Sequence, residues 1–153
     1  MERFLTRVLS TFFYVGYLPL IPGTLGSLAG LILYFLVRGS PVNYAALTCA
    51  VTLAGFLVCG RAERSSGKSD PRQVVIDEVS GMLISLLFIP YDLRLALIGF
   101  FLFHLLDTLK PFPCGRLERL KGSLGIMGDD LIAAIYTNLI LQAAIKLASF
   151  KAS

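Results

Sequence analysis

The sequence predicts an all-α protein, a multihelical integral membrane bundle of about five apolar helices, some of them short or only partly inserted. Hydrophobic residues make up 56% of the chain and charged residues 16%, whereas typical soluble domains contain about 25% charged residues. The mean hydropathy is +0.75, and the apolar residues form runs divided by short polar segments. The length of 153 residues suits a single domain over 1–153. The alternative is a soluble helical bundle with a very apolar core.

The net charge and the cysteines indicate that the chain binds neither nucleic acid nor a metal through thiols. The formal net charge of +4 is mild, and no basic run alternates with stacking aromatic residues, so we expect no nucleic-acid partner. The three cysteines, Cys49, Cys59 and Cys114, form no CxxC pair. We therefore expect reduced structural thiols without a role in metal binding.

The N-terminal half contains three apolar segments. The first, within residues 1–22, is interrupted by two prolines, which argues against a cleaved signal peptide. The second ends at Val37, and Thr24 suits its N-cap because its hydroxyl can accept from a free N–H of the first turn. The third, residues 42–60, is nineteen residues long without a charge, which is enough to span a bilayer.

The C-terminal half alternates polar and apolar segments in the same way. Pro111 lacks an N–H and disfavours helix at the residue before it, so we expect a helix to end near Lys110. We interpret residues 111–128, which contain four glycines, as a long loop. The other expected segments are a polar loop at 61–73, apolar runs at 82–89 and 95–106, and a last helix at 129–150.

The distribution of basic residues predicts an orientation. If the N-terminus is cytoplasmic and the five apolar runs from residue 22 onwards all cross, ten of the fourteen lysines and arginines lie inside, as the positive-inside rule favours. A first helix that re-enters instead of crossing is the alternative. The same assignment brings one group of polar residues to the cytoplasmic face: Thr24, Asp77, Glu78, Asp107, Lys110, Asp129 and Asp130.

Half of the acidic residues lie in three short motifs, Asp77-Glu78, Asp107 and Asp129-Asp130. Carboxylates in this number suit a hard divalent cation such as Mg²⁺. Each motif also has a simpler explanation: a solvated helix start, an ion pair with Lys110, and helix capping, in that order. Because Asp77 and Glu78 are about 100° apart around a helix, we expect only one of them, Glu78, to face the site.

Two further features suit a phosphate group. Pro22 is followed by Gly23, Thr24, Gly26 and Ser27, where free N–H groups of a helix start and small residues allow an anion to approach. Capping by Thr24 alone is the alternative.

The single histidine, His104, precedes Asp107 by one helical turn. It suits either proton transfer or a hydrogen bond inside the bundle. Lys110 is the basic residue best placed to contact a phosphate.

Four segments resemble, in order, motifs of the phosphatidylglycerophosphatase A family, at residues 16–27, 77–81, 103–113 and 122–134. The resemblance implies a multihelical enzyme of the bacterial inner membrane that faces the cytoplasm. It also implies Mg²⁺-dependent hydrolysis of phosphatidylglycerol phosphate to phosphatidylglycerol and phosphate in phospholipid biosynthesis. The chain departs from the family at His104, where arginine is usual, and at Ser123, Gly128 and Ala134.

The resulting hypothesis assigns a role to each candidate residue. Asp107, Lys110, Asp129 and Asp130 are expected to be catalytic, and Asp77 and Glu78 to join the three aspartates in holding Mg²⁺. Contacts with the phospholipid substrate are expected from Gly23, Thr24, Gly26, Ser27, His104 and Lys110. The alternatives are a small transporter or ion pathway built on clustered carboxylates, and a non-catalytic membrane subunit.

Overall fold

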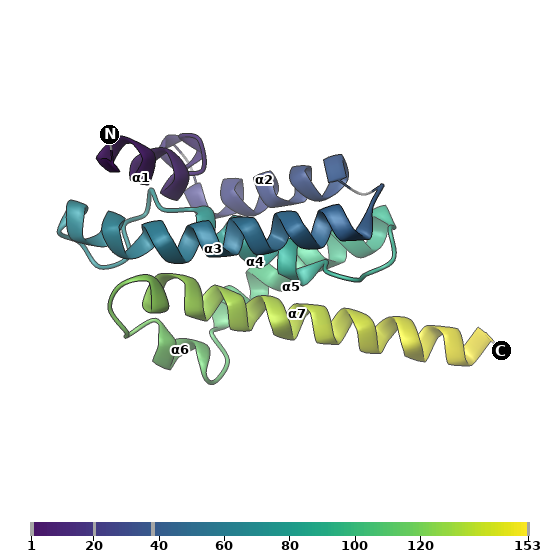
Figure 1. Ribbon diagram of the computed structural model, residues 1–153. Coiled ribbons are helices and arrows are strands. Elements are labelled where there is room, and N and C mark those ends of the chain that lie inside the picture. The colour runs from purple at the N-terminus through teal and green to yellow at the C-terminus, as the bar shows by residue number, and fades with distance from the viewer. Residues whose placement is uncertain (1, 20, 38, 153) are drawn as a thin grey trace.

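The computed structural model describes residues 2–19, 21–37 and 39–152, and every regular element within these ranges is a helix (Figure 1). No strand occurs in them, so the predicted all-α class is confirmed. The elements are α1 (Glu2–Ser10), the 3₁₀ turn η1 (Val15–Tyr17), α2 (Pro22–Val37), α3 (Pro41–Ser66), α4 (Ile76–Ser85), α5 (Leu93–Leu109), α6 (Cys114–Leu117) and α7 (Ser123–Ala152).

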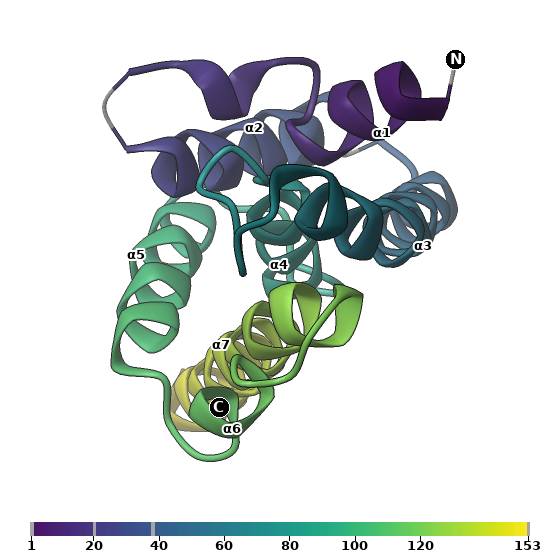
Figure 2. The same ribbon diagram turned by 90° about the vertical axis from the view of Figure 1, so that its left-hand side faces the viewer.

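Helix α4 forms the centre of the bundle. Figure 2 looks onto one end of the molecule and shows α4 with α2, α3, α5 and α7 around it, and α4 contacts all four. Eight of its ten residues are buried, so its polar side chains are enclosed by the other helices. The core around it includes Met82, Leu83 and Phe103, all with no exposed surface.

Small residues allow α2 to lie directly against α4. A Cβ atom added to Gly26 would come within 2.9 Å of the Val75 carbonyl oxygen, and one on Gly30 within 2.8 Å of the Val79 carbonyl oxygen. The two glycines are four residues apart and thus share one face of α2, a spacing common where membrane helices pack closely. This contact fixes the start of α2 beside the start of α4.

Among the described residues, two helices are long and apolar enough to cross a membrane, α3 and the part of α7 from Ser123 to Phe150. Both carry exposed leucines, such as Leu57 on α3 and Leu147 on α7, each 66% exposed. Helix α2 is apolar but shorter. Helix α4, with ten residues, is only about 15 Å long against about 30 Å of hydrocarbon. The expectation that all five apolar runs cross is therefore wrong for α4, although short helices were predicted.

The last helix begins at Ser123, six residues earlier than predicted, and α6 lies in the expected loop. Contacts with α3 hold this first turn. Ser123 donates to the Phe56 carbonyl at 2.6 Å and accepts from the Gly60 N–H at 2.8 Å, while the Glu63 carboxylate accepts from the Gly122 N–H. These partners lie about 60 residues away, so the glycine-rich sequence alone indicated a loop.

Candidate functional site

A cavity of about 340 Å³ lies where the starts of α2 and α4, the end of α5 and the second turn of α7 converge. Figure 2 faces this end of the bundle. The segment 70–74, between α3 and α4, forms another side of the cavity. The lining residues are Ile21, Pro22, Gly23, Asp70, Arg72, Val74, Asp77, Glu78, Asp107, Lys110, Ile126, Asp129 and Asp130.

Two groups of three carboxylates lie in the cavity and share one member. Asp77, Glu78 and Asp130 each place an oxygen within 4.8 Å of the other two, and Asp107, Asp129 and Asp130 do the same. The five acids singled out from the sequence therefore come together from three helices, with Asp130 between the two groups.

The donor set fits a hard divalent cation. One carboxylate oxygen each of Asp77, Glu78 and Asp130 is buried without a hydrogen-bond partner among the described residues, an arrangement that is costly unless something binds there. Oxygens on one Mg²⁺ lie about 2.1 Å from the ion, and thus about 3 to 4.2 Å from one another. The observed groups are close to this spacing, and small side-chain rotations would reach it.

The simpler explanations for the acidic motifs do not hold. Asp77 is 6% exposed, so it is not part of a solvated helix start. Asp129 and Asp130 follow the first residue of α7 by six and seven positions, which is too far along the helix for capping. Both Asp77 and Glu78 reach Asp130, so the expectation that only one of them faces the site is wrong. The two side chains converge on Asp130 although the residues are about 100° apart around the helix.

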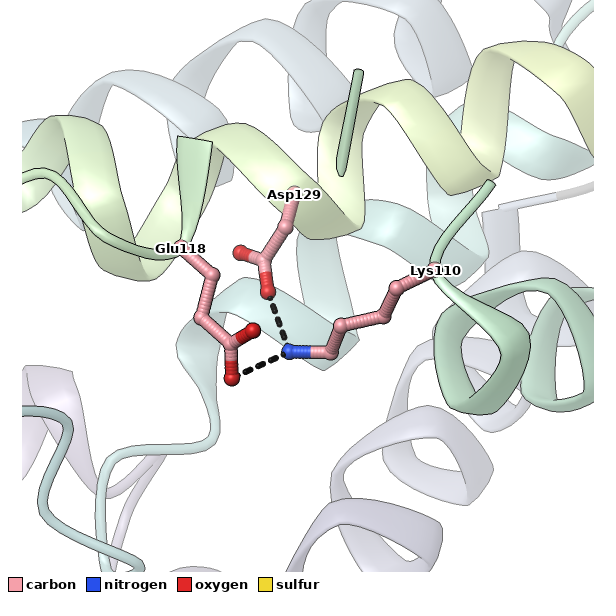
Figure 3. A network of polar contacts seen from close by, with 3 residues as sticks. All are labelled: Lys110, Glu118 and Asp129. Atoms are coloured by element: carbon pink, nitrogen blue, oxygen red, sulfur yellow. Dashed lines mark hydrogen bonds and ion pairs between the residues drawn. The ribbon is translucent and has the colours of Figure 1, made fainter. Parts of the chain in front are cut away.

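Lys110 is held by two acids other than Asp107, so the ion pair that was the simpler explanation for Asp107 is not formed (Figure 3). Its ammonium nitrogen lies 2.8 Å from Asp129 Oδ2 and 2.8 Å from Glu118 Oε1, and no ion pair with Asp107 is found among the described residues. The physical reason is the backbone: α5 ends at Leu109, and Lys110 is its C-cap in the left-handed conformation, with φ of 45°. The i,i+3 relationship on a helix face, which would place Lys110 beside Asp107, is thereby broken.

The cavity carries a large excess of negative charge. Six carboxylates line it, against two basic groups, Arg72 and Lys110. Desolvation lowers the pKa of Lys110, but the hydrogen bonds and ion pairs with Asp129 and Glu118 raise it by a larger amount. The pKa of Lys110 therefore lies above its usual value, and the ammonium stays charged. Desolvation, followed by the charge of Asp129, raises the pKa of Asp70 at the cavity wall. An anionic substrate would be repelled here without bound cations.

Four of the residues predicted to contact substrate do not line the cavity: Thr24, Gly26, Ser27 and His104. Gly26 packs against Val75, and the Ser27 hydroxyl is fully buried and donates to the Gly23 carbonyl at 3.2 Å. The ring of His104 lies against Phe100 at 4.8 Å between centroids. Of the predicted glycine-rich anion site only Gly23 lines the cavity, because the other small residues serve the packing of α2 on α4.

Three residues at the site were missed by sequence reasoning. Asp70 and Arg72 line the cavity from the segment before α4, and Glu118 pairs with Lys110 from the residue after α6. All three residues lie in segments that the sequence predicts to be loops, where charged residues are usually solvated. Nothing in their local pattern marks them, since their position depends on how the loops fold back over the helix ends.

The profile of the phosphatidylglycerophosphatase A family matches residues 8–145. The chain belongs to this family. The match covers most of the chain and includes every acid of the two carboxylate groups. It confirms the resemblance that the four ordered segments indicated.

The chain is also similar to three curated relatives. The chain is 35% identical over 150 residues to a candidate phosphatidylinositol-3-phosphatase of Bacteroides thetaiotaomicron, covering 92% of this chain and 94% of the relative. It is 33% identical to the phosphatidylglycerophosphatase A of Escherichia coli, covering 88% and 80%, and 36% identical to that of Haemophilus influenzae, covering 90% and 86%. The comparison with solved structures found no match.

Proposed function

We propose that the protein is a Mg²⁺-dependent lipid phosphatase that hydrolyses phosphatidylglycerol phosphate to phosphatidylglycerol and phosphate in phospholipid biosynthesis. The observation that carries this proposal is the pair of carboxylate groups that share Asp130 beside the charged Lys110. Membership of the family and the names of two relatives support the substrate.

The five carboxylates would hold Mg²⁺, which would polarise the phosphoryl oxygens and offset the negative charge of the cavity. Lys110 donates two of its three N–H groups to Asp129 and Glu118 and keeps one for a phosphate oxygen. Its clamped position means that little reorganisation is needed as charge builds on the phosphoryl and leaving oxygens. The N–H groups at the start of α2, around Gly23, can donate to the remaining oxygens.

The arrangement supports a phosphatase over the transporter hypothesis. A transporter places its charged residues near the middle of the bilayer, at broken helices. Here Asp107 lies near the end of α5, Asp77 and Glu78 at the start of α4, and Asp129 and Asp130 in the second turn of α7. A substrate with its acyl chains in the bilayer could present a terminal phosphate to such an end.

We further propose that the protein spans the bacterial inner membrane several times with this cavity facing the cytoplasm. The last turns of α3 and the loop that follows carry four basic residues, Arg61, Arg64, Lys68 and Arg72, and this loop lies at the same end as the cavity. In a variant without native thiols, Lys68→Cys in this loop should react with a membrane-impermeant thiol reagent only after the cytoplasmic side is opened. Reaction in intact cells would contradict the orientation.

The activity is tested by phosphate release in mixed micelles with Mg²⁺ or with chelator. Phosphatidylglycerol phosphate should be hydrolysed only with Mg²⁺. Phosphatidylinositol 3-phosphate is the second candidate substrate, because one relative is named for it, and it belongs in the same assay. Release from neither lipid would contradict the proposed function, whereas faster release from the inositol lipid would move the substrate assignment to that head group.

A further inference from the structure

A second cavity, of about 550 Å³, lies beside the acidic one and has the opposite charge. Arg3 and Arg7 of α1 and Arg64 of α3 line it, and no carboxylate is among its described lining residues. The three guanidinium groups have no ion pair within the part of the chain that the structure describes. Three like charges around one cavity repel one another, so a bound anion would stabilise the arrangement.

The two cavities are separated by a single stretch of chain. Asp70, Arg72 and Val74 line the acidic cavity, whereas Pro71, Gln73 and Val74 line the basic one. Alternate residues of this segment thus contribute to opposite sides. The basic cavity is therefore distinct from the carboxylate site, and it has its own helices, α1 and the last turn of α3.

The chain that borders the basic cavity at Tyr17, residues 13–19 and 21, carries exposed apolar side chains and forms its apolar rim. Tyr17 lines the cavity and is 51% exposed, and the chain around it carries further exposed apolar side chains. Aromatic residues with one polar end favour the boundary between lipid tails and water. These exposed residues are Phe13, Tyr14, Leu18 and Ile21, and Ile21 also lines the acidic cavity.

We propose that this cavity binds the phosphate of an anionic phospholipid, with Arg3, Arg7 and Arg64 around the head group and the acyl chains along the exposed residues of segment 13–21. A soluble anion would account for the arginines but not for the apolar rim. A zwitterionic lipid would account for the rim, but the three arginines would repel the cationic group of its head group. This site does not depend on the function proposed for the acidic cavity.

The absence of tryptophan from the chain allows a direct binding test. Tyr17→Trp introduces one fluorophore at the cavity, in full-length protein in neutral detergent with chelator present. Phosphatidylglycerol with brominated acyl chains should quench it saturably, at a lower mole fraction than phosphatidylcholine with the same chains. Equal quenching by the two lipids would overturn the proposal. Mass spectrometry of lipid retained by the unsubstituted chain gives the same comparison without a reporter.

The arginines are tested by Arg3→Gln, Arg7→Gln and Arg64→Gln together in the reporter background. We expect the binding of phosphatidylglycerol to weaken about a hundredfold, because each of the three basic residues near an anionic lipid contributes about fivefold to binding. The matched control is Arg61→Gln, an exposed arginine of α3 outside the cavity lining. Equal effects of the triple variant and the control would overturn the assignment.

Inorganic phosphate distinguishes the two sources of a phosphate ligand. Added at constant ionic strength, it should leave the quenching by brominated phosphatidylglycerol unchanged, because the apolar rim contributes to lipid binding. Displacement of the lipid at concentrations close to that of the protein would assign the cavity to a soluble phosphate and overturn the lipid assignment.

Discussion

Lys110 Nζ and Asp129 Oδ2 lie 2.8 Å apart although the residues are 19 positions apart in the chain. This contact ties the end of α5 to the second turn of α7, and it places the positive charge beside one of the two carboxylate groups (Figure 3). A non-glycine residue with positive φ, as Lys110 has, is held there by its surroundings and often marks a functional site.

Lys110→Ala should lower kcat as well as raise KM for the lipid substrate. The ammonium would contact the phosphate more strongly as charge develops in the transition state, so we expect a loss of about 2–4 kcal/mol in kcat/KM. Lys110→Arg should recover only part of this loss, because a planar fork does not reproduce a point charge. The measurement is initial-rate kinetics in mixed micelles at saturating Mg²⁺.

The control for this variant is Lys68→Ala, which removes an exposed lysine of the same charge in the loop after α3. Unchanged kcat/KM in Lys110→Ala would reduce Lys110 to a structural partner of Asp129 and Glu118. If the fall in kcat/KM matched an equal fall in the amount of folded protein, Lys110 would likewise have only a structural role.

Helix α5 offers a matched pair of acids at its two ends. Asp107→Asn removes a charge from the carboxylate cluster and should abolish Mg²⁺-dependent activity without unfolding the protein. Asp92→Asn removes a charge from the other end, where Asp92 caps α5 by accepting from Arg94 N–H at 2.7 Å, and asparagine caps equally well. Activity assays and circular dichroism in detergent measure both effects. Similar activity in the two variants would contradict the role given to Asp107.

Gly23→Ala tests whether the position of Glu78 matters. An added Cβ would lie 2.6 Å from Glu78 Oε1, so the flexible carboxylate should move while the helices stay in place. We expect a higher Mg²⁺ concentration for half-maximal activity with little change in thermal stability. Gly39→Ala is the control, because nothing lies within 4 Å of its Cβ. An identical Mg²⁺ dependence in the two variants would show that the start of α2 does not affect the site.

The sequence predicted the helical class from local patterns, and it predicted the convergence of the acids from the orientation that the basic residues indicate. Apolar runs and their breaks mark the helices, and the acids stand at or near those breaks. The sequence could not predict the partner of Lys110, because this partner depends on a left-handed C-cap that turns the lysine side chain from Asp107 towards α7. The role of Gly26 and Ser27 was misassigned because small residues at a helix start suit both anion binding and close helix packing, and only the position of α4 decides between them.

The last prediction concerns the number of cations. Asp130 belongs to both carboxylate groups, so it would help to hold a cation in each of them, as in sites that use two metal ions. The composition of the lining agrees with bound cations: six carboxyl groups and two basic groups line the cavity, an acidic excess that divalent cations would offset. We expect calorimetry with Mn²⁺ in neutral detergent to give two ions per chain, and Mn²⁺ resonance spectra to show two coupled ions. Glu78→Gln should remove one ion, and Asp130→Asn should weaken both. A single ion that survives Asp130→Asn would contradict the shared site.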